Sequence, residues 1–298
     1  MKILSFTFSD RMLGVALMAS SLAIGSVAAE EKHAGKSADE IAKELANPNN
    51  DLARLTFKNQ YYWYGGDLPD AYKQDNYTLL FQPIFPFSLG TTESGNKETF
   101  FLRPAVPLVI DQPVPGPSGF HNVSTLGDIG FDAAYALSTK NGLLFAAGMV
   151  GSLPTAVDGV AASKELRLGP ELLIAQVTKY GVFGIFPSHL WDVASYDEGK
   201  ATKFSRTEIQ PIIALTPGGG WQIASKPKID YHWILNQWTV PINLAVAKTI
   251  KFGDLPVQIE LEGSYYIERP DAFDQEWMIG LNITPVVPNF IENMFKGK

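Results

Sequence analysis

The chain has 298 residues, of which 46% are apolar and 18% are charged, so it can bury a large apolar surface and is not disordered. Its net charge of −7 argues against binding to a nucleic-acid backbone, and we expect no nucleic-acid partner. Because cysteine is absent, disulfides, thiolate metal sites and cysteine nucleophiles are excluded.

Residues 1–29 are predicted to be a cleaved signal peptide. Lys2 and Arg11 precede an uncharged stretch, 12–29, and Val27 and Ala29 fit the small residues that signal peptidase requires. An uncleaved anchor is the alternative, because 18 uncharged residues nearly span a bilayer. We predict cleavage because the segment is rich in small residues. No later apolar stretch is that long, so the exported chain is expected to carry no helical anchor.

The segment after the signal, residues 30–51, is predicted to be a polar preface in the periplasm. Within it, Ser37–Glu40 has the sequence of a capping box, which predicts a helix over 38–46. The apolar side of that helix contains only two large residues, Ile41 and Leu45. We therefore expect the helix to be mobile or weakly docked.

From residue 52 onward the hydrophobic pattern has a period of two. In 255–268 the odd positions are mainly apolar and the even positions carry three carboxylates, and 128–138 and 221–233 repeat this design. Successive side chains of a strand point to opposite faces, so one face is apolar and the other charged. We predict twelve strands, at about 52–65, 76–88, 98–110, 127–138, 143–154, 168–178, 182–194, 205–216, 221–234, 237–249, 255–268 and 275–285.

The connections between these strands alternate in length. Tight turns are separated by longer polar loops, at 66–75, 111–126, 155–167 and 195–204. This asymmetry, and strands long enough to cross a bilayer, are typical of outer-membrane barrels. We predict an all-β fold: a transmembrane antiparallel up-and-down β-barrel of about twelve strands over 52–285. The short helical preface precedes it, and a periplasmic tail, 286–298, follows it.

A soluble β-sandwich or a smaller lipocalin-like barrel is the alternative, because a period of two alone does not distinguish them. Aromatic residues near the strand ends favour the membrane barrel, since they suit interfacial girdles. They are Trp63, Tyr64, Trp221, Trp233, Trp238 and Trp277. Prolines inside the predicted strands predict bulges or kinks, because proline cannot donate to a ladder. They are Pro83, Pro104, Pro170, Pro211 and Pro227.

Three short motifs give a resemblance to a known family: Gly127–Gly130, Ser152–Thr155 and Trp277–Asn282. With the signal and the strand pattern, they resemble a bacterial family described as outer-membrane transporters of the phenol meta-degradation pathway. Its members have sometimes been labelled neuromedin U. The resemblance implies an outer-membrane barrel that moves small, often aromatic, molecules, and it supplies no catalytic residues. The tail beyond the last strand departs from barrels that end on an aromatic residue.

The charged faces of the strands are expected to line the lumen and to set its selectivity. The residues are Arg54, Lys58, Arg103, Asp128, Asp132, Glu171, Arg206, Glu208, Lys226, Lys228, Asp230, His232, Glu260, Glu262 and Glu268. Such charges either pair and brace the lumen or line a wet path. Their mixed signs favour bracing, which leaves room for a small neutral or aromatic solute. Tyr62, Tyr64, Tyr266 and Phe186 could line its route.

We expect no enzyme, no cofactor and no metal site. Of the four histidines, His33 lies in the preface, His121 in a loop, and His189 on the opposite face from Ser188. His232 lies near Asp230 and is better explained as a polar contact than as a base. The expected partners are outer-membrane lipid and lipopolysaccharide, the barrel-insertion machinery and a small-molecule solute.

Three functions therefore stay open. The first is a passive outer-membrane channel or transporter for small molecules. The second is a closed structural barrel whose long loops bind a partner. The third, which the histidine positions disfavour, is an outer-membrane lipid hydrolase.

Overall fold

The computed structural model describes residues 36–157, 163–195, 203–289 and 291–292. The predicted signal peptide, residues 30–35 of the preface and most of the C-terminal tail lie outside the described residues. Within the described ranges, no helix is long and apolar enough to cross a membrane.

The described residues form one helix of three turns, a short 3-10 helix and fourteen strand segments. These are α3 (Ala38–Ala46), β1 (Ala53–Gly65), η2 (Ala71–Lys73), β2 (Asp75–Thr91), β3 (Lys97–Gly116), β4 (Gly119–Leu126), β5 (Ile129–Ser138), β6 (Leu143–Leu153), β7 (Glu165–Thr178), β8 (Gly181–Ser195), β9 (Ser205–Gly218), β10 (Trp221–Ser225), β11 (Ile229–His232), β12 (Gln237–Phe252), β13 (Leu255–Glu268) and β14 (Asp274–Val287). A further helical turn is assigned at residues 291–292.

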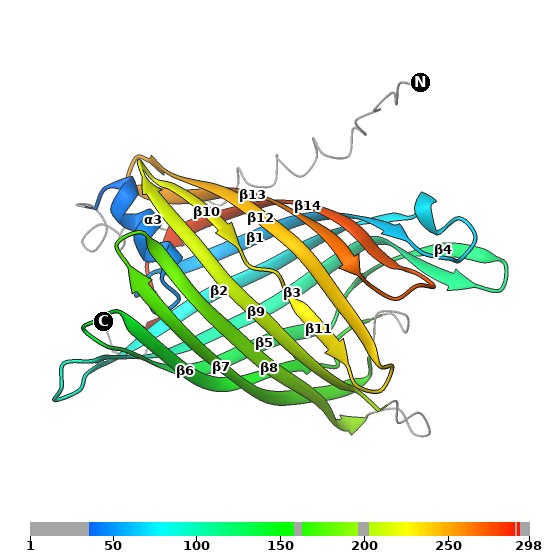
Figure 1. Ribbon diagram of the computed structural model, residues 1–298, viewed down its shortest axis with the longest axis horizontal. Coiled ribbons are helices and arrows are strands. Elements are labelled where there is room, and N and C mark those ends of the chain that lie inside the picture. Colours follow the sequence, from blue (N-terminus) through cyan, green and yellow to red (C-terminus); the bar gives the residue numbers. More distant parts are fainter. Residues whose placement is uncertain (1–35, 158–162, 196–202, 290, 293–298) are drawn as a thin grey trace. The chain divides into compact units, whose positions relative to one another are not determined.

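The strands close into a barrel (Figure 1). Apart from β4 with β5 and β10 with β11, neighbours in sequence pair antiparallel, and β1 pairs with β14 to complete the ring. β4 and β5 follow one another along β3, and β10 and β11 follow one another between β9 and β12. The fourteen segments therefore make twelve positions around the barrel, and the predicted up-and-down fold is confirmed.

The two ends of the barrel differ. We call the end that carries α3 and the short turns the helix end, and the opposite end, with the longer connections, the loop end (Figure 1). The predicted loop 111–126 is wrong, because β3 and β4 continue there as a hairpin. Among the described strands, β4 pairs with β3 alone, so the hairpin keeps an open edge there. Such an edge tolerates Pro113 and Pro115, because proline cannot donate to a ladder hydrogen bond.

The apolar side chains lie on the outer face. Leu255, Ile259 and Leu261 on β13 are exposed, and so are most large apolar residues of the other strands. Leu261 keeps 59% of its surface accessible, in a wall whose backbone groups pair around the whole ring. A continuous exposed apolar band on a closed sheet suits lipid and not water. The alternative with these side chains in a dry core is therefore wrong.

Five of the six tryptophans lie near the loop end of the outer face, and Trp221 lies at the helix end, directly after the β9–β10 turn. Trp63 lies directly opposite Trp277, and Tyr231 packs against Trp233 and Trp238 with ring centroids 4.9 and 4.7 Å away. All six tryptophans are exposed, including Trp191, which sequence reasoning missed. The prediction that Tyr64 belongs to the outer aromatic girdle is wrong: its side chain is 5% exposed, because strand alternation turns it inward from Trp63, to the side on which it was also expected to line the route.

Most of the strand prolines leave the register unchanged, contrary to the predicted bulges. Pro83 and Pro104 share one gap in the β2–β3 ladder, which resumes at Phe85 and Leu102 in the same register. Pro170 sits at a similar gap between β7 and β8. Two prolines that face one gap remove few ladder hydrogen bonds. Pro227 lies in the break between β10 and β11, and the register with β9 and with β12 is the same on both sides of that break.

The helix α3 packs on the helix end of the barrel. Ser37 accepts from the Glu40 backbone, and the Glu40 carboxylate accepts from the Ser37 backbone, completing the predicted capping box. These hydrogen bonds lower the pKa of Glu40 below its ordinary value. Ile41 is fully buried in a cluster with Leu45, Leu52 and Val286. The apolar side is small but sufficient, because the strand ends at the barrel mouth complete it.

Candidate functional site: the barrel lumen

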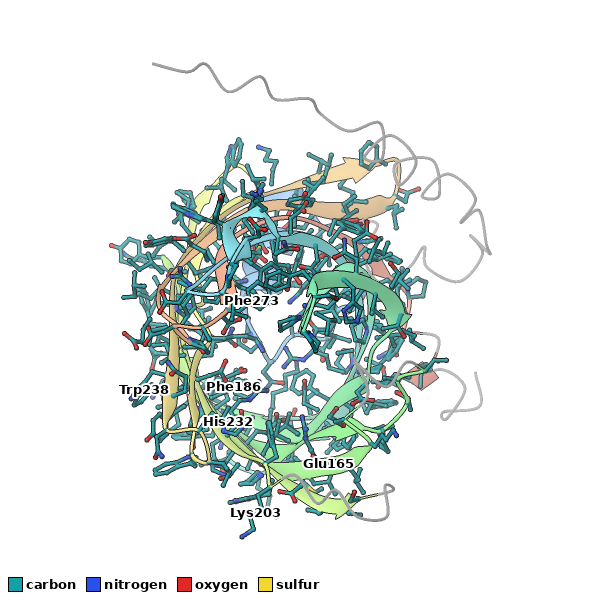
Figure 2. All side chains as sticks on the ribbon, turned by 90° about the vertical axis from the view of Figure 1, so that its right-hand side faces the viewer. Glu165, Phe186, Lys203, His232, Trp238 and Phe273 are labelled. Atoms are coloured by element: carbon teal, nitrogen blue, oxygen red, sulfur yellow. The ribbon has the colours of Figure 1, made fainter. Side chains whose placement is uncertain are left out.

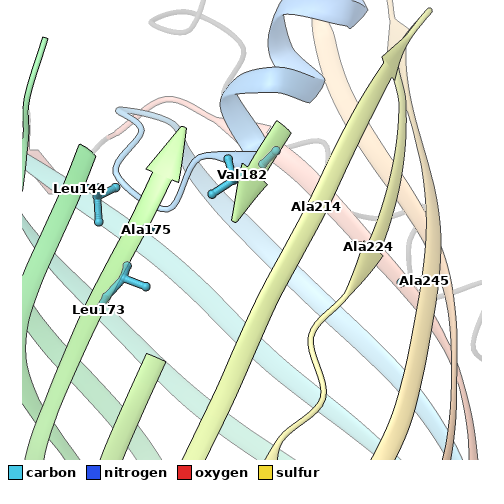
Figure 3. Packing of buried hydrophobic residues seen from close by; sticks show 8 residues of the cluster. Leu144, Leu173, Ala175, Val182, Ala214, Ala224 and Ala245 are labelled. Atoms are coloured by element: carbon cyan, nitrogen blue, oxygen red, sulfur yellow. The ribbon is translucent and has the colours of Figure 1, made fainter. Parts of the chain in front are cut away.

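Small apolar side chains line the lumen at the helix end (Figure 3). Ala46, the last residue of α3, belongs to this cluster, which we call the alanine ring. Its other members are Leu144, Leu173, Ala175, Val182, Ala214, Ala224 and Ala245. Alanine on the inward positions of β7, β9, β10 and β12 leaves space at this end, and the chain after α3 occupies part of it.

Residues 36–52 cross this end of the barrel, and we call them the cap. α3 contacts β8, β9, β10, β12 and β13 on one side. On another side, Asn49 donates to the Ser138 hydroxyl of β5, and Lys97 of β3 forms an ion pair of 2.8 Å with Asp51. Asn49 is 1% exposed. The cap is therefore anchored to strands around most of the ring.

Charged side chains form the middle layer of the lumen. Arg103 and Asp132 face each other on β3 and β5, and Arg103 Nε donates to Asp132 Oδ2 at 2.7 Å. Lys228 Nζ lies 3.0 Å from Glu208 Oε1. Ion pairs thus lie on the inward face at two places, between β3 and β5 and between β9 and the segment that joins β10 to β11, where strand alternation predicted them.

A second set of polar contacts continues this layer across β13 and β14. Asn282 Nδ2 donates to Glu260 Oε1 at 2.9 Å, and Lys226 Nζ lies 3.7 Å from the other oxygen of Glu260. Gln60 Nε2 donates to Glu262 Oε1 at 3.2 Å. Sequence reasoning missed the amides Asn282 and Gln60, because an uncharged residue on an alternating face carries no special signal.

The remaining charged residues of this layer are less tightly held. Arg206 Nε and Asp230 Oδ1 are 3.6 Å apart, too far for a hydrogen bond, and both atoms are buried without another partner. Arg54 and Lys58 on β1 form no ion pair with another described residue. The charges of Glu262, Lys226 and Lys228 act electrostatically on the Lys58 ammonium group without direct contact.

Three predicted lumen residues lie at the loop end and not in the charged layer. Asp128 accepts from the backbone N–H groups of Ala156 and Ser163, both at 2.9 Å, and so holds the β6–β7 connection. Glu268 is the exposed last residue of β13. His232 accepts from the Leu235 backbone and presents its ring edge-on to Phe204. Periodicity gives the face of a residue but not its depth.

Aromatic residues narrow the loop end from inside (Figure 2). Tyr64 stacks on Phe273 with ring centroids 4.7 Å apart, and Phe120 of the β3–β4 hairpin packs on the same ring at 4.6 Å. Gln112 Nε2 donates to the Tyr64 hydroxyl at 3.0 Å. Phe120 and Phe273 lie in segments without periodicity, so no sequence signal identified them.

A cavity of about 250 Å³ opens inside the charged layer. Its wall includes Arg103, Asp132, Glu171, Phe186, Glu208 and Lys228. Phe186 was expected along the route. Gln82, Ser152 and Ser188 also line the cavity and were not predicted. The cavity is thus small, is lined by both polar and apolar groups, and borders two aromatic rings, Phe131 and Phe186.

The histidines do not form a serine hydrolase triad in the described residues. His189 Nε2 lies 3.1 Å from Ser205 Oγ, but the group at its other nitrogen is the Thr207 hydroxyl, at 2.7 Å, and not a carboxylate. Ser188 faces the cavity, away from His189, as predicted. No group of three or more metal-ligating side chains is assembled among the residues that the structure describes.

Comparisons with known proteins show which solved structures have a similar fold. No protein-family model matches the chain, and no curated protein matches it. The structure is similar to an outer-membrane channel from Pseudomonas putida F1, with a TM-score of 0.57 and 10% identity over 81% of this chain and 97% of that one. It also matches the NanC porin, with a TM-score of 0.46 and 12% identity over 78% and 98% of the two chains.

The barrel fold and its apolar exterior define the class: a twelve-stranded closed β-barrel like those of outer-membrane proteins. At 10% identity the Pseudomonas channel shares this fold, and the likeness does not extend to individual lumen residues.

Proposed function

We propose that the protein is an outer-membrane channel that passes small molecules through its lumen. One observation carries the proposal: a cavity of about 250 Å³ lies inside a closed barrel whose exterior is apolar and whose interior is charged. A closed sheet with lipid outside and polar groups inside gives polar solutes a route across the membrane that the lipid bilayer itself does not give them. We place the protein in the outer membrane, after export and signal cleavage, with lipopolysaccharide and the insertion machinery as partners.

The proposed solutes are small and include aromatic molecules. Most cations of the charged layer are paired with carboxylates, so no large excess of one sign selects a simple ion. Aromatic rings border the route at Tyr64, Phe273 and Phe186. The motif resemblance to transporters of the phenol meta-degradation pathway supports the same class.

A closed structural barrel is the second candidate, and the cap favours it. Residues 36–52 contact strands around the helix end, and the paired charges brace the middle. In that case the loop end would carry the function, by binding a partner. The two candidates differ in whether solutes cross the barrel at all.

Flux through reconstituted vesicles separates these candidates. We expect liposomes that contain the purified protein to take up small neutral sugars and phenol faster than protein-free liposomes, and to exclude solutes larger than the cavity. The control is the heat-denatured protein in the same lipid. Flux no greater than in that control, for every small solute tried, would support the closed barrel.

A further inference from the structure

Three carboxylates stand in one row across the lumen wall. Glu171 on β7 pairs in register with Ser188 on β8, Ser188 pairs with Glu208 on β9, and Glu208 pairs with Asp230 on β11. Glu208 and Asp230 lie on neighbouring strands, about 4.8 Å apart, and Glu171 lies two strands from Glu208, roughly 9.6 Å away. Like charges at these separations in a partly buried wall repel unless cations compensate them, so each position of the row calls for a nearby cation.

Only part of the row is compensated within the described residues. Lys228 lies 3.0 Å from Glu208, and Arg206 lies 3.6 Å from Asp230. Arg103 attracts Glu171 through space, but its Nε donates to Asp132 at 2.7 Å, and no hydrogen bond joins it to Glu171. Glu171 is the carboxylate of the row that forms no ion pair with another described residue.

Glu171 is buried at the cavity, and one of its carboxylate oxygens has no hydrogen-bond partner among the described residues. The residue is 2% exposed, its Oε2 has no hydrogen-bond partner, and its side chain lines the 250 Å³ cavity. A buried carboxylate without a partner costs free energy comparable to a lost charged hydrogen bond. Such a group, aimed at a cavity, suits a ligand that brings the missing donor.

The other residues that line the cavity indicate the chemistry of the ligand beyond its hydrogen-bond donor. Phe186 and Ser188 are two residues apart on the same face of β8, so the Phe186 ring lies diagonally beside Glu171. An aromatic face attracts a cation and packs against an apolar ring. Ser188 and Gln82 add neutral hydrogen-bonding groups. The cavity lies below the usual range for drug-sized ligands, about 300–1,000 Å³, so one ring fits best.

We propose that this cavity is a binding site for a small primary amine with an aromatic or apolar body, whose ammonium group contacts Glu171. The ammonium supplies three donors and the positive charge that the carboxylate row lacks. The inference rests on the proposed channel function and names one solute class for it. Binding within the lumen would make amines both permeants and blockers of the channel.

Equilibrium binding to the intact protein in detergent tests the site without requiring transport. The probes are phenethylamine, 2-phenylethanol and phenylacetate, titrated by calorimetry. We expect the amine to bind at least tenfold more tightly than the alcohol, and the carboxylate not to bind. Glu171→Gln keeps the shape and removes the charge, so it should weaken amine binding at least tenfold. Glu268→Gln, which changes an exposed carboxylate outside the cavity, should leave binding unchanged.

Heat-modifiable migration on gels verifies that each variant is a folded barrel, and Glu171→Asp, which keeps the charge, should retain part of the affinity. Alcohol binding as tight as amine binding, or amine binding unaffected by Glu171→Gln, would overturn the site. Amine binding by a barrel that passes no solute into liposomes would overturn the channel function and leave the site intact.

Discussion

Ile41→Asp is expected to increase the single-channel conductance severalfold by releasing the cap from the helix end. Ile41 is fully buried against Leu45, Leu52 and Val286. Removing a buried isoleucine costs about 2–5 kcal/mol, and burying a carboxylate there adds to the cost. A loss of about 3 kcal/mol shifts the docking equilibrium more than 100-fold toward the undocked cap. Planar-bilayer recordings measure the result.

Lys43→Gln is the matched control for this experiment. Lys43 is on the same helix, half exposed, and pairs with Asp39 at 2.8 Å. Exposed pairs of this kind contribute about 0–1 kcal/mol, so the cap should stay docked and the conductance should stay at the wild-type value. Equal conductance in both variants, with folded barrels, would show that the cap is not the barrier.

Arg103→Gln is expected to make the channel cation-selective. The substitution leaves Asp132 and Glu171 without their shared cation at the cavity. One uncompensated charge at about 6 Å, in an effective dielectric of about 40, is worth about 1.4 kcal/mol, or tenfold in ion partition. The reversal potential in a potassium chloride gradient reports this change. The permeability ratio of cation to anion should rise between threefold and tenfold.

The double variant Arg103→Gln with Asp132→Asn isolates the charge effect. It removes both members of the pair, so the net lumen charge returns to that of the wild-type protein. Its selectivity should return toward the wild-type value with little loss of stability, since replacing both members of the pair leaves no uncompensated charge. If the double variant is as cation-selective as the single variant, the selectivity is set elsewhere.

Much of the barrel could be predicted from the sequence because the two faces of its wall meet different environments. A wall with lipid on one side and polar groups on the other forces a period of two, which is visible in Leu255–Glu268. Turn residues such as Gly142 and Gly220 then fix where each strand ends. The same pattern gave the inward face of Arg103, Glu208 and the other members of the charged layer.

Other features could not be predicted, for physical reasons. The depth of Asp128 depends on the tilt and stagger of strands, which the alternation does not encode. The docking of α3 depends on Leu52, which follows the helix, and on Val286 of β14, which is far from Ile41 in sequence. Arg103 donates to Asp132 of β5 and forms no hydrogen bond with Glu171 of β7, so Glu171 Oε2 has no partner among the described residues. This arrangement is visible only in the assembled barrel wall.

Water access to two faces of the wall tests the central claim most directly, namely that the charged face lines a hydrated lumen and the apolar face meets lipid. Because the chain has no cysteine, Ser188→Cys in the cavity and Leu261→Cys on the outer face each introduce a single thiol. In liposomes, a small water-soluble maleimide should label Ser188→Cys and leave Leu261→Cys unlabelled. Labelling of Leu261→Cys with protection of Ser188→Cys would contradict the account.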